Sequence, residues 1–514
     1  MSLALSAPNV ARPDPGGSDA GTAPVADQPT SLGGRVARPR PLCVDLDGTL
    51  VRSDLAHEAI VSYLRHHPWS LWRLVGWLGQ GRDILKAELA ARTRLRPDLL
   101  PYRSDIVDHI AAHRRAGGEA HLVTASPRVW ADAVAEHLGV FDSVSGSERG
   151  RNLKGRVKAR HLVARFGERG FDYIGDCRDD RPVWRVAGTS LGAGGRAARH
   201  LAADASVFTD DRGTARSLLA AARPHQWLKN LLVFTALFTA HRVDDASAIV
   251  AALLAFAAFC CCASSAYLVN DLIDLENDRL HPRKRDRPFA SGAARIADGV
   301  LLAPALIAAA MLLCLALPPA FAATLLVYYA LTHAYSWTLK RRAPADVFTL
   351  AVLYTLRVVG GAAAIGAPLS LWLLAFSMFL FLGLATLKRH VELLEAADRG
   401  NGTAAGRGYW TGDGPVLVAM GVAAGSCAVV VLSFYVGQPH VAGLYETPAL
   451  LWLICPMLLY WTSRLWLLAQ RRQMHDDPVV FAVRDPVSRK TIALCALVAS
   501  AAAELELAWS FVGA

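Results

Sequence analysis

Two groups of carboxylates in this chain of 514 residues have the spacing of groups that do chemistry together. The first group is Asp45 and Asp47, in the run Asp-Leu-Asp-Gly-Thr that follows the apolar stretch 41–44. Two carboxylates at positions i and i+2 beyond a strand end can face the same pocket. One of them can then attack phosphorus while the other donates a proton to the leaving oxygen. The spacing therefore indicates phosphoryl-group chemistry.

The second group is Asp271, Asp274 and Asp278, in the run Asn-Asp-Leu-Ile-Asp-Leu-Glu-Asn-Asp. The spacing i, i+3, i+7 predicts that all three carboxylates lie on one helical face. Three like charges on one stripe repel one another unless a divalent cation bridges them, and Mg²⁺ held by carboxylates and a diphosphate meets this need. The cationic segment 279–287 follows directly and suits phosphate oxygens.

Three further stretches follow the first carboxylate group in order. Residues 122–126 end an apolar run with a hydroxyl and backbone N–H groups that suit a phosphoryl oxygen. Lys154 and Lys158 open a predicted helix at about 155–166, where an ammonium can neutralise transition-state charge. The run 175–180 carries carboxylates of the kind that Mg²⁺ prefers.

This order of motifs resembles the haloacid dehalogenase (HAD) superfamily. The resemblance implies that Asp45 forms an aspartyl-phosphate, that Asp47 is the general acid and base, and that Thr124 binds a phosphoryl oxygen. We prefer Lys158 to Lys154 as the cation, although the spacing leaves both open. The implied Mg²⁺ ligands are Asp45, Asp47, Asp176 and Asp180.

The front half of the chain reads as a soluble α/β domain. We expect a disordered tail at 1–38, a Rossmann-like domain at 39–205 and a linker at 206–222. Its strands are expected at 41–44, 120–124 and 172–175. The long insertion after the first strand predicts a small helical cap with three tryptophans: Trp69, Trp72 and Trp77. We expect these aromatic residues to serve mainly in packing, and the alternative is that they suit a lipid-linked substrate beside the membrane.

From residue 223 onward the chain reads as a helical membrane domain. Hydrophobic residues make up 53% of the chain and mean hydropathy is +0.28, which excludes a disordered or fibrous protein and indicates a membrane component. The apolar blocks predict about nine spans, at 228–241, 247–269, 298–317, 319–337, 346–365, 370–387, 414–436, 447–469 and 491–511.

The charges between these spans predict their orientation in the cell membrane. Loops 271–296, 338–345, 388–413 and 470–490 hold 18 Lys and Arg residues, whereas Arg242 is the single one in the opposite loops. By the positive-inside rule, the basic loops and the front domain are cytoplasmic. These loops also account for the net charge of +10 without a nucleic acid partner.

The second carboxylate group resembles the first acidic motif of the UbiA superfamily of intramembrane prenyltransferases, and nine helices match that fold. The runs 223–230 and 278–288 resemble the decaprenyl-phosphate phosphoribosyltransferase branch. The resemblance implies Mg²⁺ on the three carboxylates and a set of residues that bind substrate: Lys229, Asn230, Asn270, Lys284, Arg285, Arg287, Lys340, Asp346, Arg357 and Lys388. We expect Lys388 to have Glu392 as its i+4 partner and assign no role to Asp477.

The resemblance implies transfer of ribose 5-phosphate from phosphoribosyl pyrophosphate to a polyprenyl phosphate in the bilayer. The fusion suggests that the HAD domain then removes the 5-phosphate. The alternative is a prenyltransferase that moves an isoprenoid chain from its diphosphate to an aromatic acceptor. Such enzymes carry a second D-x-x-x-D motif, whereas Asp346 stands alone here, with Arg342 four residues before it and Leu350 four after.

Overall fold

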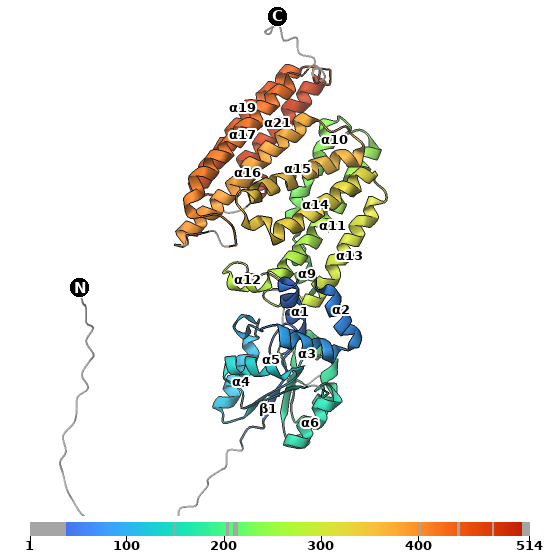
Figure 1. The fold of residues 1–514 in the computed structure, drawn as a ribbon, viewed down its shortest axis with the longest axis vertical. Coiled ribbons are helices and arrows are strands. Elements are labelled where there is room, and N and C mark those ends of the chain that lie inside the picture. Colours follow the sequence, from blue (N-terminus) through green and yellow to red (C-terminus); the bar gives the residue numbers. More distant parts are fainter. Residues whose placement is uncertain are drawn as a thin grey trace, which may run out of the picture.

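The computed structural model describes residues 38–148, 150–201, 205–208, 214–400, 402–403, 406–438, 441, 443–474 and 477–505. Apart from Arg38, the predicted tail lies outside the described residues. Figure 1 shows a sheet-containing domain at one end of a long bundle of helices. The multidomain α/β plus all-α architecture predicted from the sequence is therefore confirmed.

The front domain is built on one parallel sheet of six strands. Its order is β3-β2-β1-β4-β5-β6, and every pair of neighbouring strands is parallel. The strands are β1 (Leu42–Val44), β2 (Ala120–Pro127), β3 (Ser143–Ser147), β4 (Asp172–Gly175), β5 (Ser190–Ala193) and β6 (Val207–Phe208). The crossover helices include α5 (Arg128–Leu138), α6 (Arg156–Phe166), α7 (Arg181–Trp184) and α8 (Gly194–Ala198).

The strand order fixes where a site can form. The middle strand β1 is buried along its whole length, as expected for a strand covered by helices on both faces. The order of strands reverses between β1 and β4, and ligands bind at such switch points outside the carboxyl ends of the strands. The predicted strands match β1, β2 and β4. The strand β6 and the helix α9 (Thr214–Ala221) lie in the stretch that we predicted as a linker.

Four helices lie between β1 and β2, of which the first three form the cap and the fourth packs on β2 beside the sheet. They are α1 (Leu55–His66), α2 (Leu71–Gln80), α3 (Arg82–Arg92) and α4 (Ser104–Arg115). The side chain of Asp54 caps α1 by accepting a hydrogen bond from the backbone N–H of Ala56. Leu55, Leu85 and Leu89 join the apolar core under the sheet, so the cap and the sheet share one core.

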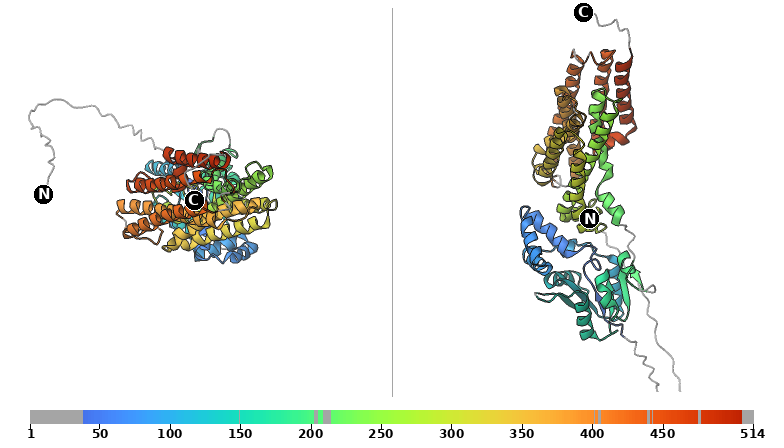
Figure 2. Two further views of the ribbon diagram at one scale, coloured as in Figure 1. Left: turned by 90° about the horizontal axis from the view of Figure 1, so that it is seen from above. Right: turned by 90° about the vertical axis from the view of Figure 1, so that its right-hand side faces the viewer.

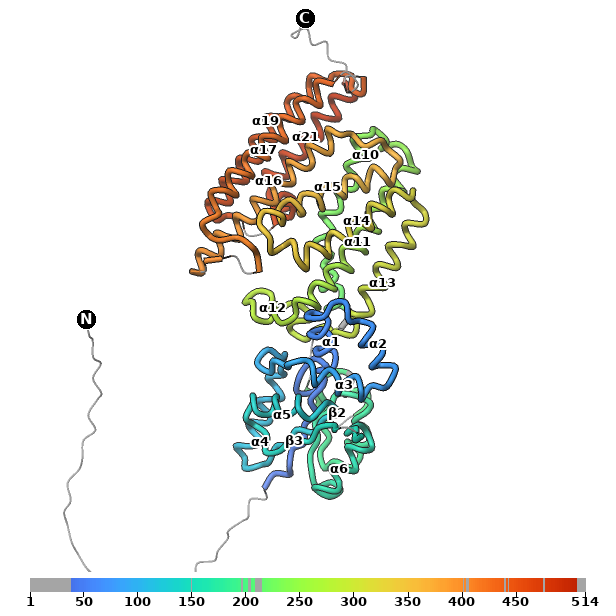
Figure 3. The backbone as a smooth tube through the Cα atoms, in the orientation of Figure 1, coloured from blue at the N-terminus to red at the C-terminus, as the bar shows by residue number. Residues whose placement is uncertain are grey.

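The membrane domain follows as a series of helices (Figure 3). A first span made of η3 (Pro224–Phe234) and α10 (Thr235–Thr239) leads to α11 (Ala246–Ile273), the short α12 (Leu275–Leu280), α13 (Ile296–Cys314) and α14 (Pro319–Trp337). The remainder comprises α15 (Ala345–Ile365), α16 (Leu371–Asp398), α17 (Gly414–Val436), α19 (Ile454–Gln470) preceded by η6 (Pro448–Leu453), α20 (Pro478–Arg484) and α21 (Pro486–Glu504).

Six helical segments of the described residues are long and apolar enough to cross a membrane. They are Ala246–Ile273, Ile296–Cys314, Ala345–Ile365, Leu371–Asp398, Thr411–Val436 and Pro448–Gln470. The count of nine is thus approximate. The first predicted span is divided between η3 and α10, and α14 and α21 carry polar residues such as His333, Arg489 and Lys490.

The cap helix α1 joins the two domains. It packs on α11 and α13, and Val61 enters an apolar cluster with Leu268 and Leu272 of α11. At the edge of this cluster Arg279 of α12 forks onto Glu58, with Nη2–Oε1 and Nη1–Oε2 distances of 2.6 and 3.0 Å. Both side chains are buried, so this ion pair and the apolar cluster hold the domains together.

Candidate active sites

The front-domain site lies at the carboxyl ends of β1, β2 and β4. Oδ1 of Asp45, directly after β1, is 2.9 Å from Nζ of Lys158 on α6. Asp47 accepts hydrogen bonds from the backbone N–H of Leu55 at 2.8 Å and from Oγ of Ser126 at 2.6 Å. Thr124 donates a longer hydrogen bond of 3.5 Å to the same oxygen of Asp47. The structure therefore brings the predicted acids, hydroxyl and lysine into one pocket.

The two candidate lysines occupy different surroundings. The Lys158 side chain is 3% exposed and also donates to the hydroxyl of Tyr173 at 2.9 Å. The Lys154 side chain is 49% exposed and forms its ion pair with Asp179, at 2.9 Å. The geometry therefore places Lys158, and not Lys154, beside the Asp45 carboxylate.

Burial shapes the electrostatics of this pocket. Burial is the main cause that raises the pKa of Asp45 to about 8, against the opposing effect of Lys158. Burial, followed by the nearby Asp54 charge, also raises the pKa of Asp47. Burial alone would lower the pKa of Lys158, but the carboxylates of Asp45 and Asp180 outweigh it and raise that pKa. The raised pKa of Asp47 suits a carboxyl group that must carry a proton to a leaving oxygen, and the ammonium of Lys158 favours the ionised form of Asp45.

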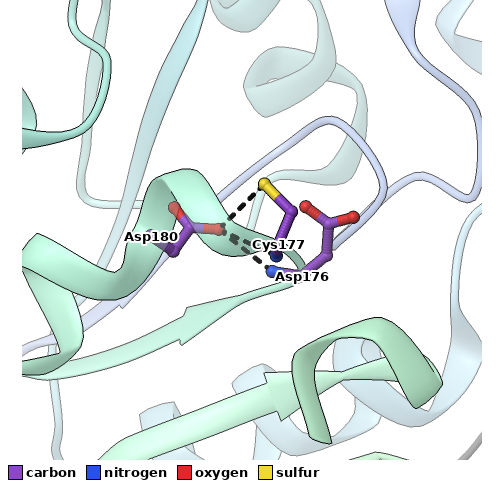
Figure 4. A group of neighbouring side chains, drawn as sticks. All are labelled: Asp176, Cys177 and Asp180. Carbon is purple, nitrogen blue, oxygen red and sulfur yellow. Dashed lines mark hydrogen bonds between the residues drawn. The ribbon is translucent and has the colours of Figure 1, made fainter. Parts of the chain in front are cut away.

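The carboxylate of Asp180 stabilises the loop after β4. Its Oδ2 accepts from the backbone N–H groups of Asp176 and Cys177, and its Oδ1 accepts from the Tyr173 hydroxyl at 2.7 Å. Figure 4 shows the Asp176 carboxylate on the other side of the Cys177 side chain from Asp180. Asp180 therefore holds the loop while its carboxylate stays within reach of Asp176, and its role as a Mg²⁺ ligand stays a prediction.

The donors around Asp176 nevertheless suit a hard cation. Ligand atoms of Asp176, Cys177 and Asp180 lie within 4.8 Å of one another. Burial, with the two carboxylates adding to it, raises the pKa of the Cys177 thiol well above its usual range, so the thiol stays protonated. Oxygen atoms are then the available donors, and these are what Mg²⁺ prefers. Asp176 and Asp180 are the carboxylates of this group, and Asp45 and Asp47 stay predicted ligands.

The membrane-domain acids do not lie on one continuous helix. The helix α11 ends at Ile273, Asp274 is non-helical, and α12 begins at Leu275. Our prediction of a single helical stripe was therefore wrong at its centre. The break still brings Asp271 and Asp278 together, because Nη1 of Arg287 lies 3.1 Å from Asp271 Oδ1 and 2.7 Å from Asp278 Oδ2.

Other cations surround these acids. Lys340 Nζ is 2.8 Å from Asp274 Oδ2, and Arg223 is a second partner of Asp271. The predictions for Arg287 and Lys340 thus coincide with contacts to the acids. The second oxygen of Asp271, Oδ2, is buried and has no hydrogen-bond partner within the described residues. An acceptor oxygen without a donor at the centre of an acidic cluster fits a Mg²⁺ ligand.

The remaining residues of this segment differ in their surroundings. Lys284 is half-buried, and burial followed by the Arg287 charge lowers its pKa. Asn270 is half-buried in the last turn of α11. Arg285 instead lines a cavity of about 280 Å³ between the two domains, opposite Tyr102. The structure therefore separates Arg285 from the acidic cluster.

A second cluster joins three segments of the membrane domain at Asp477. Its Oδ2 is 2.8 Å from Lys229 Nζ and 2.7 Å from Lys388 Nζ, and its Oδ1 accepts from the Tyr354 hydroxyl at 3.3 Å. Burial alone would raise the pKa of Asp477, but the two ammonium groups hold it well below its usual range. Lys388 thus pairs with Asp477, whereas Glu392 pairs with Arg389, which corrects the expected i+4 pair.

Sequence reasoning missed Asp477. It lies directly before Pro478 and caps α20 by accepting from the N–H of Val479. This capping pattern was visible in the sequence and locates a helix start. It says nothing about the lysines, which lie 89 and 248 residues away.

Two further predicted residues belong to a fully buried network. Nε of Arg357 donates to Asn230 Oδ1 at 2.8 Å, and its Nη2 donates to the Tyr328 hydroxyl at 2.8 Å. The Arg357 guanidinium also lies over the ring of Tyr354, which links this network to the Asp477 cluster. Asn230 is wholly buried, so its contacts orient Arg357 instead of reaching into an open site.

Asp346 is also fully enclosed. Its two oxygens accept from Arg389 and from the hydroxyl of Tyr409, and Arg389 further donates to Tyr335 at 2.8 Å. Asp346, in the first turn of α15, is therefore neutralised by Arg389 of α16. This arrangement links the helices α15 and α16, and the role of Asp346 in binding substrate stays a prediction.

Comparison with known proteins matches both parts of the chain to described families. Residues 231–483 match the UbiA prenyltransferase family, and residues 79–185 match the haloacid dehalogenase-like hydrolases. The uncharacterized protein y4nM of Sinorhizobium fredii is 38% identical over 458 residues, which cover 88% of this chain and 89% of that protein.

Two further relatives match shorter stretches of the chain. The nodulation protein NoeC of Azorhizobium caulinodans is 37% identical over 269 residues, covering 52% of this chain and 86% of that protein. Decaprenyl-phosphate phosphoribosyltransferase of Mycolicibacterium smegmatis is 38% identical over 180 residues, covering 34% of this chain and 57% of that protein. The last match therefore spans little more than half of its relative.

The two candidate lysines of the front domain can be separated by substitution. Lys158→Met removes the buried ammonium beside Asp45, and we expect hydrolysis of p-nitrophenyl phosphate to fall about 100-fold or more. Lys154→Met removes an exposed ion pair, and we expect a change of about twofold at most. Steady-state rates of the full-length variants, with melting temperatures to exclude misfolding, test this. Equal losses in both variants would contradict the assignment.

The Asp477 cluster predicts a large loss of stability when its carboxylate is neutralised. Asp477→Asn leaves the buried ammonium of Lys229 and the half-buried ammonium of Lys388 without their anion, which should cost about 3–5 kcal/mol. The control Asp298→Asn removes a partly exposed pair with Arg295 and should cost about 1 kcal/mol or less. Thermal unfolding in detergent measures both. If the lysines also bind phosphate, pyrophosphate should raise the melting temperature of Asp477→Asn more than that of the wild type.

Proposed function

Because the chain belongs to the UbiA prenyltransferase family and carries a HAD-like domain in front of its membrane domain, we propose that it catalyses two consecutive reactions. The membrane domain transfers 5-phosphoribose from phosphoribosyl pyrophosphate to a polyprenyl phosphate. The HAD domain then removes the 5-phosphate from the lipid product. The relative named decaprenyl-phosphate phosphoribosyltransferase supports the choice of donor and acceptor.

The observation that carries this proposal is that cations form two separate groups beside the acids of the membrane domain. Arg223, Arg287 and Lys340 contact the acids directly, and Lys229 and Lys388 form a second cationic pair. A donor with a diphosphate and a 5-phosphate carries anionic groups at two ends. Two separate groups of cations suit such a donor better than an isoprenoid diphosphate, whose other end is a hydrocarbon.

In the transferase step, an oxygen of the polyprenyl phosphate attacks the anomeric carbon of the donor. The bond from that carbon to the pyrophosphate oxygen breaks, and pyrophosphate leaves with the bonding electrons. Asp271 and Asp278 would hold Mg²⁺, which supplies positive charge toward the leaving pyrophosphate when bound. Arg287 and Lys340 bind phosphate oxygens and hold the donor in place.

In the phosphatase step, the Asp45 carboxylate attacks the phosphorus of the 5-phosphate. The ester P–O bond breaks, and Asp47 donates its proton to the leaving ribose oxygen. Water then attacks the aspartyl-phosphate, with Asp47 accepting its proton, and phosphate is released. Lys158 and the hydroxyl of Thr124 stabilise the charge on the phosphoryl oxygens.

We also propose that the front domain and the basic loops face the cytoplasm. The bias of 18 Lys and Arg residues against one supports this orientation. In a Cys427→Ser background, a cysteine introduced at Gly443 should react with an impermeant maleimide added to intact cells. A cysteine at Thr403 should react only after the membrane is permeabilised. The reverse pattern would refute the orientation.

The two reactions can be tested with ribose-labelled phosphoribosyl pyrophosphate and polyprenyl phosphate in lipid nanodiscs. The wild type should yield labelled lipid without a 5-phosphate, together with free phosphate. Asp45→Asn should accumulate the 5-phosphorylated lipid, because the membrane site is untouched. Asp271→Asn should lower lipid labelling about 100-fold or more, since an amide is a poor substitute for a metal-binding carboxylate.

Two outcomes would overturn separate parts of the proposal. If the wild type labels no lipid, the transferase assignment is wrong. If Asp45→Asn and the wild type give the same final lipid, the HAD domain does not act on the transferase product. Phosphate release from p-nitrophenyl phosphate serves as the control that the wild-type HAD domain is active.

A further inference from the structure

The cap carries an exposed apolar surface on α2 and the residue that precedes its N-cap. Trp69 is 84% exposed and Trp72 is 68% exposed, and Leu71, Val75 and Leu78 are each more than half exposed. We call these five side chains the α2 patch. Our prediction that the cap aromatics serve in packing is therefore wrong for Trp69 and Trp72, although it fits Trp77, which packs against the core.

The α2 patch occupies one side of an amphipathic helix. Residues 71, 75 and 78 recur at i, i+4 and i+7, so they share one face, with Trp72 at its flank. The adjoining side holds Leu74 and Trp77, which face the cap core. The ring of Trp77 lies 5.5 Å from the ring of Tyr63. The helix is therefore fixed to the cap by one face and has no protein cover on the other within the described residues.

The position of α2 relative to the membrane helices identifies what covers the patch. The preceding helix α1 packs on α11 and α13, both of which can cross a membrane. Figure 1 shows α2 beside the lower end of α13, at the level where the spans end. In the view from above in Figure 2, the blue cap helices project beyond the yellow helices of the bundle. A helix at that level and outside that footprint is in the right place to meet the border of a bilayer that surrounds the spans.

The charges around α2 favour the same neighbour. No Asp or Glu occurs between Glu58 and Asp83, whereas Arg73 and Arg82 lie in this stretch and Arg65 is paired with Glu276. The guanidinium of Arg73 lies 5.2 Å from the centre of the Trp72 ring. Tryptophans on the apolar face and arginines at the polar side are typical of helices that lie in the membrane interface.

We propose that α2 is an interfacial helix that inserts the α2 patch into the bilayer leaflet on the side of the HAD domain. The ligand is the phospholipid surface itself, bound by the apolar side chains at the boundary between head groups and acyl chains. The arginines add attraction to anionic head groups. This proposal rests on the membrane domain and on the position of the cap, and it holds whatever substrate either site uses.

The experiment uses photo-crosslinking of the full-length protein in nanodiscs of phosphatidylcholine and phosphatidylglycerol. The photoreactive residue p-benzoylphenylalanine replaces Trp72 in one variant and Val75 in another. In the matched control it replaces Val129, an equally exposed residue on α5 of the same domain. After illumination, mass spectrometry of the intact protein should detect phospholipid adducts at positions 72 and 75 in at least tenfold excess over position 129.

Two results would overturn the proposal. The first is equal lipid adducts at all three positions, which would show only incidental contact. The second is a crosslink from position 72 or 75 to another copy of the chain, which would make the patch a protein interface. Because all three side chains are exposed, the substitutions leave the core intact, and size-exclusion chromatography verifies this before illumination.

Discussion

Charges at the border of a membrane domain must be compensated by fixed partners, and this constraint organises both membrane clusters. Asp271 and Asp278 both form an ion pair with Arg287, and Asp477 forms ion pairs with both Lys229 and Lys388. In a medium of low dielectric constant, an unpaired charge costs several kcal/mol, so each acid needs its cation close by. A phosphate group can replace such a carboxylate as the anion beside a cation. In a cluster whose charges are balanced without substrate, a phosphate oxygen can therefore take the place of a carboxylate oxygen beside the cation.

The same constraint explains how one short helix serves two domains. Asp278 of α12 faces the acidic cluster through Arg287, while Glu276 and Arg279 pair with Arg65 and Glu58 of the cap helix α1. The helix is interrupted at Asp274, so α12 does not continue straight along the axis of α11. Because of this break, the charged side chains of α12 reach the acidic cluster on one side and the cap helix α1 on the other. The acidic motif is thus part of the domain interface as well as of the candidate transferase site.

The helix α1 extends this connection to the phosphatase site. Its first residue, Leu55, donates its backbone N–H to Asp47, and one turn later Glu58 binds Arg279. The proposed general acid is therefore anchored by the same helix that docks on the membrane domain. The site lies at the carboxyl edge of the sheet, and this edge is therefore the one from which α1 reaches the membrane domain.

The sequence was sufficient to predict which residues lie together wherever this follows from the order of motifs or from a rule of the fold. Asp45, Thr124 and Asp176 lie at the ends of parallel strands, and parallel strands end at the same edge, so the order of the motifs alone predicts that these residues are close together. The preference for Lys158 also agrees with the structure, although its basis was a motif and not a distance. The broken helix at Asp274 was not foreseen, because the spacing i, i+3, i+7 fits a straight helix equally well.

What the sequence could not reveal depends on contacts between distant segments. Asp477 meets lysines 89 and 248 residues away, and Asp346 meets Arg389, 43 residues away. Periodicity identifies which residues share a face of one helix, but not which helix faces which. Trp69 and Trp72 illustrate the same limit, since an apolar helical face reads alike whether protein or lipid covers it. Which apolar helical faces lack a protein partner therefore depends also on what surrounds the chain, and the sequence of the helix does not specify this.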